Sequence, residues 1–455
     1  MAHQRSVVMA HQRSVVIHKN TSKDTIWMND IYIFRKIFKD SLFKNSMYLM
    51  VTNFTNLILG FFFWIIASKY YTPNDIGITS TILSSTSLIS MISSVGFPTA
   101  LLFYLPRDPK NANRIINSCL MTSIVISIVF SIIFIIGLNI WEPLLTTIFD
   151  DIGLIMIFII VTTITTVSAL MSGIFIAERR SSFHMLKESI FGIIKIFPLI
   201  IFAGFGAIGI YMSWGIGLIV AMITGLFLLY RILKYLPKFV FDPIIKNMVG
   251  FSSGNYVAVI FNSLPRLILP IMIANIISTA SAGYFFIAMT IAGILYGIAQ
   301  SISSSLLTES SSGDIWPKVG KAVRLNVILL IPGLLSFIIF GRFFLDLFNP
   351  NYAENATTTL IILSVTGIPL SAINIFNTVR NSQKKVGSII RINAIVAIIT
   401  LIISIPLMKV LNLEGAALAY LIANVIGATI VIIRIKNPKE FTLKLLKGDK
   451  DVIPI

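Results

Sequence analysis

Apolar runs that are too long for the core of a soluble domain constrain this chain most. The stretch IINSCLMTSIVISIVFSIIFIIGLNI (115–140) contains no charged residue. Runs of roughly 18 or more apolar residues are typical of helices that cross the hydrocarbon core of a membrane. Only 12% of the 455 residues are charged, whereas soluble domains have about a quarter. The sequence therefore predicts an all-α polytopic membrane protein.

Twelve apolar segments can be delimited, and all connections between them are short. The longest internal connection, 231–249, is basic and falls midway, so we expect it to link two six-helix bundles, 46–230 and 250–434. The segments are 47–68, 76–104, 115–140, 152–177, 189–207, 208–230, 250–276, 281–307, 323–346, 356–379, 388–408 and 413–433.

Two pairs of glycines suggest that the halves arose by duplication. Gly77 and Gly283 are 206 residues apart, and so are Gly209 and Gly415. Because each half contains an even number of spans, both halves insert with the same orientation. We expect a pseudo-two-fold axis along the membrane normal and a central cavity between the bundles.

Lys and Arg are distributed very unevenly between the two sides. With the N-terminus placed in the cytoplasm, 31 of them fall in cytoplasmic segments and three, Lys69, Arg342 and Lys409, on the opposite side. Short cytoplasmic loops are enriched in Lys and Arg. We therefore expect a multi-pass protein of the plasma membrane with both termini in the cytoplasm, including a tail over 435–455.

The N-terminal region divides into two parts. The octapeptide MAHQRSVV occurs twice, at 1–8 and 9–16, within a polar extension (1–28) that we expect to be disordered. Over 29–45, apolar residues fall on one helical face and basic residues on the other. This pattern favours a helix lying on an anionic membrane surface, although a solvated charged segment has the same composition.

Sorting the charges by depth separates cations from carboxylates. All nineteen Asp and Glu residues are expected in loops, tails or span ends, and only Lys195 and Arg266 lie well inside spans. Charged residues within a bilayer are rare and usually face a cavity or a partner. The single cysteine, the four histidines and the absence of a phosphate-binding loop predict no metal, no cofactor and no catalytic residues.

Arg266 is the most informative of these residues. It lies ten residues before the end of its span, or about 15 Å at 1.5 Å per residue. Asn255 and Asn262 share its helical face, and Pro265 and Pro270 are expected to open the helix, which is tolerated where a helix lines a cavity. We expect Arg266 to contact substrate, and the alternative is that it binds backbone carbonyls freed by the prolines.

Further polar residues extend the candidate site. Lys195 lies close enough to the cytoplasmic end to face either the cavity or the interface. Asn53 and Asn56 share a face of the first span, and the 206-residue offset takes Asn56 to Asn262. The second span is rich in Ser and Thr, which indicates close helix packing more often than a cavity. Buried cations without carboxylates favour an anionic substrate, such as a phosphate, which guanidinium binds well.

Several segments resemble the polysaccharide transporters of the multidrug/oligosaccharidyl-lipid/polysaccharide (MOP) exporter superfamily. The stretch 61–102, which includes SKYYTPNDIGITST, is similar to their first helix pair, and 264–311, beginning LPRLILPIM, to their seventh and eighth helices. The segments 349–369 and 411–427 are similar to later family segments. The resemblance implies a V-shaped pair of six-helix bundles working by alternating access. It also implies a polyprenyl-pyrophosphate-linked oligosaccharide as substrate, bound by cationic cavity residues.

The leading hypothesis is therefore a flippase for a lipid-linked oligosaccharide in surface polysaccharide biosynthesis. Its partners would be that substrate, membrane lipid and the glycosyltransferases or polymerase of the pathway, but no nucleic acid. A cation-coupled small-molecule exporter is the main alternative, and it would require an acidic residue within the first, second, seventh or eighth span. An enzyme would need longer loops with acid–base residues, and a non-transporting scaffold would leave Arg266 unexplained.

Overall fold

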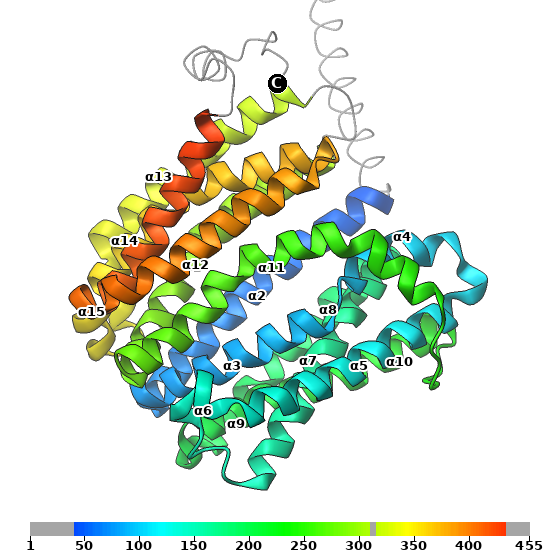
Figure 1. Ribbon diagram of the computed structural model, residues 1–455, viewed down its shortest axis with the longest axis horizontal. Coiled ribbons are helices and arrows are strands. Elements are labelled where there is room, and N and C mark those ends of the chain that lie inside the picture. Colours follow the sequence, from blue (N-terminus) through cyan, green and yellow to red (C-terminus); the bar gives the residue numbers. More distant parts are fainter. Residues whose placement is uncertain (1–40, 310–314, 434–455) are drawn as a thin grey trace, which may run out of the picture.

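The described part of the chain, residues 41–309 and 315–433 of a computed structural model, consists of helices and connecting turns without any strand (Figure 1). The expected N-terminal extension (1–28), most of the expected interfacial helix (29–45) and the tail (435–455) lie outside the described residues. The N-terminal half contains α2 (Ser41–Tyr70), α3 (Pro73–Ser93), α4 (Phe97–Tyr104), α5 (Ala112–Ile136), α6 (Leu138–Trp141), α7 (Ile152–Ala177), α8 (Ser181–Ile194), α9 (Ile196–Ile201) and α10 (Gly206–Leu233).

The C-terminal half is built from longer helices. Asn412 has a non-helical backbone and divides the last one into two antiparallel crossings. Within the described residues, ten helical segments are long and apolar enough to span a membrane. The fold is the expected one: an all-α membrane protein of two helical bundles. The helices are α11 (Ile244–Ile276), α12 (Thr279–Glu309), α13 (Trp316–Asp346), α14 (Pro350–Ser382) and α15 (Val386–Ile433).

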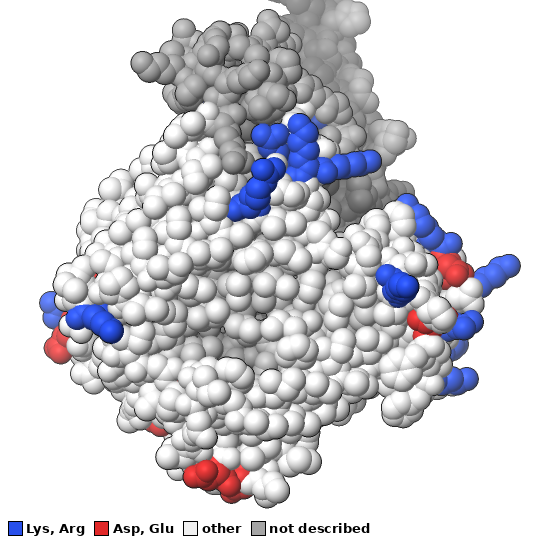
Figure 2. Space-filling view, in the orientation of Figure 1, with Lys and Arg blue, Asp and Glu red and all other residues white. Residues whose placement is uncertain are grey.

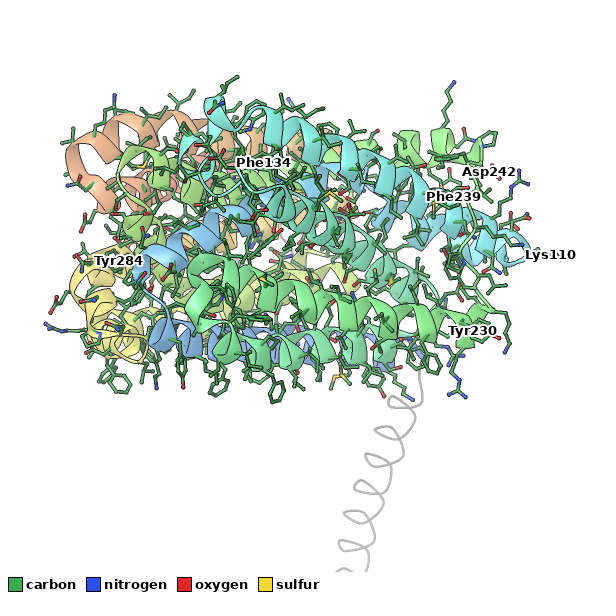
Figure 3. The ribbon with its side chains drawn as sticks, turned by 90° about the horizontal axis from the view of Figure 1, so that it is seen from below. Lys110, Phe134, Tyr230, Phe239, Asp242 and Tyr284 are labelled. Atoms are coloured by element: carbon green, nitrogen blue, oxygen red, sulfur yellow. The ribbon has the colours of Figure 1, made fainter. Side chains whose placement is uncertain are left out.

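The bundle has two chemically different ends. We call the end that carries the connections 105–111, 178–180 and 234–243 the basic end, and the other the opposite end. Figure 2 shows a broad surface free of Lys, Arg, Asp and Glu between the charged ends. In Figure 3, Lys110 and Asp242 lie at the basic end, and Tyr284 lies near the opposite end. An uncharged band of this kind is expected where a protein contacts the hydrocarbon core of a membrane.

Each bundle has a central helix and outer helices. In α3, 72% of the most apolar stretch is buried inside the protein, compared with 17% in α2 and 17% in α13. All Ser and Thr residues of α3 except Ser87 are buried, and many bond to carbonyls of their own helix, as Ser80 does to Gly77 (2.7 Å). These small residues allow α3 to approach its neighbours closely. They line neither of the cavities described below.

The two bundles meet where α3 crosses α12, at the glycine pair Gly77 and Gly283. A Cβ atom on Gly77 would lie 1.7 Å from the carbonyl oxygen of Thr279, and one on Gly283 would lie 2.3 Å from that of Pro73. Each glycine therefore packs against the helix start of the other bundle, and Pro73 and Thr279 are themselves 206 residues apart. Such a reciprocal contact is the signature of a two-fold relation.

The second glycine pair occupies equivalent places in the two halves. Gly209 packs against the carbonyl of Phe202, where the sixth crossing turns back on the fifth, and Gly415 packs against Leu407 at the corresponding turn. A side chain at either position would overlap the backbone of the preceding helix. Both pairs of glycines found in the sequence thus have the same structural role in each half.

Crossing boundaries differ from the sequence expectation at two places. The second crossing is divided into α3 and α4 by a turn in which Val95 and Gly96 have positive φ. The fifth crossing begins at Ser181, not residue 189, and breaks at Lys195. His184 and Lys187, which we expected in a loop, are therefore in α8. The first turn of α8 is polar, so hydropathy placed it outside the membrane span. In the structure it is helical, and the backbone N–H of Ser181 donates to the Asn45 side chain (3.0 Å).

This shift places a carboxylate inside the protein, contrary to the expected depth pattern. The Lys187 side chain is buried and contacts Glu188 at 2.8 Å. Its Nζ also donates to the hydroxyl (2.7 Å) and the carbonyl (2.9 Å) of Ser168 on α7. Lys187 and Glu188 therefore form a hydrogen-bonded ion pair that ties α8 to α7.

The expected linker over 231–249 is shorter than predicted, because α10 reaches Leu233 and α11 begins at Ile244. The segment between them is strapped to α5. Asn117 accepts hydrogen bonds from the Tyr235 hydroxyl (2.8 Å) and the Lys238 backbone (2.8 Å), and Arg114 pairs with Asp242. The connection is thus attached to the N-terminal bundle.

The glycine contact predicts a clear effect of added volume. We expect Gly77→Ala to lower the stability of the purified protein by about 1–3 kcal/mol, the usual cost of overpacking, because the Thr279 carbonyl must move away. Unfolding in detergent, followed by tryptophan fluorescence, measures this. Gly60→Ala is the control, since nothing lies within 4 Å of its Cβ position. Equal stability of the two variants would contradict the close contact.

The buried ion pair predicts a second stability effect. Replacing Lys187 by Met leaves Glu188 without its cation, and breaking a buried pair this way costs about 3–5 kcal/mol. The double variant Lys187→Met/Glu188→Gln should recover much of that loss, and Lys246→Met, at an exposed lysine, should be neutral. If Lys187→Met unfolds like the wild type in the same assay, the pair does not stabilise the fold.

Candidate functional site

A cavity of about 590 Å³ lies between the bundles, where α2 faces α12. We call it the central cavity. Asn53 and Asn56, both predicted as site residues, line it from α2, and Gln300 lines it from α12. It occupies the basic half of the protein, because Ser46 and Ser305, near the basic ends of α2 and α12, also line it. His184 adds the imidazole of α8.

A second cavity, of about 310 Å³, lies among helices of the C-terminal bundle, and Thr99 of α4 borders it from the N-terminal bundle. Side-chain amides dominate its wall, and we call it the amide pocket. The predicted site residues Asn255 and Asn262 line it from α11. The amides that line it are Asn255, Asn262, Gln300, Asn374, Asn377, Asn381 and Asn393, from α11, α12, α14 and α15.

The two cavities adjoin at α12. Gln300 and Ser304, one helical turn apart, line both of them. The structure therefore brings the four predicted asparagines to one region, Asn53 and Asn56 on one side of α12 and Asn255 and Asn262 on the other.

Arg266 lies one helical turn beyond Asn262 on α11, away from the basic end, and like Asn262 it is exposed. Its charge interacts with the hydroxyls of two buried tyrosines, Tyr296 on α12 and Tyr420 on α15. Tyr296 lies one turn beyond Gln300 in the same direction. Asn262 and Gln300 line the amide pocket, so Arg266 lies one helical turn from the pocket wall, but Arg266 itself is not among the residues that line either cavity.

The two prolines do not interrupt α11, contrary to expectation, and the helix continues through both. A proline has no N–H for the carbonyl four residues earlier, so Pro265 and Pro270 free the carbonyls of Phe261 and Arg266. Among the described residues, Arg266 donates no hydrogen bond to these carbonyls and forms no ion pair. Its guanidinium donors are therefore open to an external partner.

Lys195, the other predicted cation, is found in neither of the expected surroundings. It is 4% exposed, and its Nζ lies 4.1 Å from the centre of the Trp214 ring, with Phe63 and Phe191 at 4.8 and 4.5 Å. Aromatic faces attract a cation at these distances. The structure does not bring Lys195 to either cavity.

The opposite end of the bundle interface is closed by hydrogen bonds. The Ser68 hydroxyl donates to the Phe348 carbonyl (2.9 Å), and Thr279 bonds Asn74 beside the glycine pair. The Asn275 amide donates to the carbonyl of Trp141 (3.0 Å) and the carboxylate of Glu142 (3.3 Å). These contacts join the connection after α5 to the end of α11.

Glu142 is the titratable group of this closure. It is fully buried in a connection outside the membrane-spanning segments. Burial raises the pKa of Glu142 from 4.5 to about 8, partly offset by the hydrogen bond from Asn275.

The bundles also touch in the basic half, where α11 meets α3, α4 and α5. Tyr256 donates to the Ile92 carbonyl (2.9 Å), and the rings of Phe103 and Phe251 stack 4.4 Å apart. In Figure 1, α11 lies between the helices of the two bundles. The α11 contacts therefore lie on one side of the bundle interface, and the central cavity lies on the other side, between α2 and α12.

The sequence analysis identified two of the seven amides that line the amide pocket and missed the other five. Asn374, Asn377 and Asn381 are spaced by three and four residues, which puts them on one helical face, and this signal was available. Gln300 and Asn393 occur singly, and only the fold shows that they face this wall.

Comparison with known proteins supports the architecture. The family model described as "Polysaccharide biosynthesis protein" matches residues 42–308, more than half of the chain. No curated protein matches the sequence.

Solved structures with the same fold are membrane transporters. The lipid II flippase MurJ in an inward closed conformation has a TM-score of 0.69 at 16% identity, covering 87% of this chain and 89% of that chain. An inward-facing MATE multidrug resistance transporter of the MOP superfamily has a TM-score of 0.62 at 14% identity, covering 87% and 96%. The chain therefore belongs to the polysaccharide biosynthesis protein family, and it shares the fold of these MATE and MurJ structures.

Proposed function

We propose that this protein is a flippase that moves a lipid-linked oligosaccharide, carried on a polyprenyl pyrophosphate, across the membrane by alternating access. The head group would enter the central cavity and the polyprenyl chain would stay in the lipid. The family and the fold support a transporter of this superfamily, and the likeness to a lipid II flippase is in keeping with a lipid substrate.

The observation that carries the proposal is the position of Arg266. It lies ten residues before the end of α11 and one helical turn beyond Asn262 of the amide pocket, without a carboxylate partner among the described residues. A charge at this depth costs about 2.5–3.5 kcal/mol on insertion scales. An incoming pyrophosphate would offset that cost through charge-assisted hydrogen bonds. Lys195, enclosed by aromatic rings, has no part in this contact.

The direction of transport follows from the charge pattern. The positive-inside rule places the basic end, and with it both termini, in the cytoplasm of a plasma membrane. The central cavity would then receive substrate from the cytoplasmic leaflet while the opposite end is closed. Opening of that end would release the head group outside. Coupling to glycosyltransferases or a polymerase on either side would supply and consume the substrate.

A cation-coupled exporter fits the cavities less well. Among the described residues, neither cavity is lined by a carboxylate. The nearest acidic group on α8, Glu188, is already neutralised by Lys187. A cation would therefore find no anionic ligand there.

We expect Arg266→Ala to fold and to slow flipping by about 10–100-fold, since a hydrogen bond to a charged group contributes about 1.5–3 kcal/mol. Arg266→Lys should retain part of the rate, because lysine keeps the positive charge but cannot form the two parallel hydrogen bonds that a guanidinium makes to a phosphate. The assay uses vesicles with a labelled polyprenyl-pyrophosphoryl oligosaccharide and a membrane-impermeant reagent that modifies only the outer leaflet.

Arg342→Ala is the matched control, because Arg342 is an exposed arginine at the opposite end, outside both cavities. It should flip at the wild-type rate. Wild-type flipping by Arg266→Ala would overturn the proposed role of the guanidinium.

The raised pKa of Glu142 predicts a pH-dependent closure. In the closed form the pKa is about 8, and exposure on opening would return it to about 4.5, so protonation favours the closed form. Closure is strongest below pH 4.5 and weakens as the pH rises to 8. Each pKa unit corresponds to a factor of about 10 in the equilibrium. Glu142→Gln should remain closed at all pH values.

Spin labels can test this closure, because Cys119 is the only cysteine and Cys119→Ala provides the background. Labels at Asp150→Cys and Glu354→Cys, both exposed at the opposite end, report the distance between bundles. We expect a longer distance at pH 8.5 than at pH 5. The same pH response in Glu142→Gln would assign it to another group.

A further inference from the structure

We propose that the amide pocket binds one uncharged sugar residue of the transported head group and selects it against acidic sugars. This inference rests on the proposed function, because it names the sugar chemistry that the flippase would accept. It also assigns a separate role to each part of the site. Arg266 binds the pyrophosphate, the amide pocket binds the adjoining sugar, and the central cavity holds the remaining sugars.

The chemistry of the wall favours a hydroxyl-bearing, neutral ligand. Seven side-chain amides line the pocket, together with Ser303, Thr378 and other uncharged residues, and no charged residue is among the lining. Each amide offers two donors and an acceptor, which suits sugar hydroxyls and acetamido groups, since both donate and accept. A carboxylate would lose its hydration in this wall without gaining a cation.

Two hydrogen bonds fix the orientation of two pocket amides, Asn377 and Asn393. The Asn393 amide donates to the Ala258 carbonyl (3.0 Å), so its Oδ1 is turned toward Asn377, whose Nδ2 donates to it (3.0 Å). The Oδ1 of Asn377 and the hydroxyl of Ser303 are buried without a partner. Buried polar atoms normally have partners. These two atoms are therefore available to a ligand that closes the pocket around itself.

The size of the pocket limits the ligand. A volume of about 310 Å³ is at the lower end of the range for small-molecule sites, about 300–1,000 Å³. Ala258, Val259 and Ile389 contribute apolar surface to the same wall, and this surface suits the C–H face of a pyranose ring. The pocket thus fits a single ring and not a chain of sugars.

The position of the pocket fits the order of groups in the substrate. Asn262 is one helical turn from Arg266 on the same face of α11, so a sugar bonded directly to the pyrophosphate would reach the amides. Gln300 and Ser304 border the central cavity, which is nearly twice as large. A head group anchored at Arg266 can therefore place its first sugar in the pocket and extend the others past α12.

Binding of three probes with the same short prenyl chain tests the inference by calorimetry on the detergent-purified full chain. The probes are prenyl pyrophosphate, its N-acetylglucosamine derivative and its glucuronic acid derivative. We expect wild-type protein to bind the N-acetylglucosamine probe about tenfold more tightly than prenyl pyrophosphate, which corresponds to about 1.4 kcal/mol. The glucuronic acid probe should bind no more tightly than prenyl pyrophosphate.

Variants of the pocket should remove the sugar increment alone. The variants are Asn377→Leu and Asn262→Ala, the second at an exposed residue. In each variant we expect the affinities for the N-acetylglucosamine probe and for prenyl pyrophosphate to lie within about twofold of each other. The affinity for prenyl pyrophosphate should stay at the wild-type value. Asn355→Leu, on the same helix as Asn377 but exposed at the opposite end, is the control and should keep the increment.

Failure of this inference can be distinguished from failure of the proposed function. Equal wild-type affinity for all probes, or an Asn377→Leu variant that retains the increment, overturns the sugar site. Loss of the increment when sodium is replaced by choline would identify the pocket as a cation site instead. Arg266→Ala should weaken binding of every probe, and if it does not, the pyrophosphate contact is wrong whatever the pocket binds.

Discussion

The close approach of α3 and α12 at Gly77 and Gly283 is the contact on which the rest of the arrangement depends. Backbone meets backbone there, since a Cβ on either residue would overlap a carbonyl of the other bundle. The contact closes the opposite end, and the hydrogen bonds of Ser68 and Asn275 lie around it. With that end held together, the bundles can separate only toward the basic end, which is where both cavities lie.

The helices accommodate their buried charges in three different ways. Lys187 is paired with Glu188 and donates hydrogen bonds to Ser168, and Lys195 is surrounded by three aromatic rings. Both cations are therefore satisfied by the protein itself. Arg266 has no comparable partner among the described residues and lies one helical turn from Asn262, which lines the amide pocket. This difference, more than depth alone, distinguishes a cation that stabilises the fold from one that is open to a ligand.

The fold was predictable from the sequence because hydropathy and charge asymmetry act over whole segments. The contacts of single residues were harder to predict. The spacing of 206 residues identified Gly77 and Gly283, but not that they touch each other. Lys187 was placed in a loop because its charge broke the apolar pattern, whereas its partners Ser168 and Glu188 become visible only once α7 and α8 are packed. The spacing of Asn374, Asn377 and Asn381 predicts that they share a helical face. The amides across the pocket come from three other helices, so the sequence alone does not show that they are neighbours.

A single helix connects substrate binding with closure. Asn262 and Arg266 face the proposed substrate from α11, and nine residues beyond Arg266 the same helix carries Asn275, which holds Glu142. Pro270 lies between them and removes one helical hydrogen bond, so this is where α11 bends most easily. A ligand changes such an equilibrium only by binding one state more tightly than the other. We infer that a head group bound to Arg266 and Asn262 would change this equilibrium by shifting α11. The far end of α11 carries the contact of Asn275 with the N-terminal bundle, so the position of the helix determines whether that contact is kept or broken.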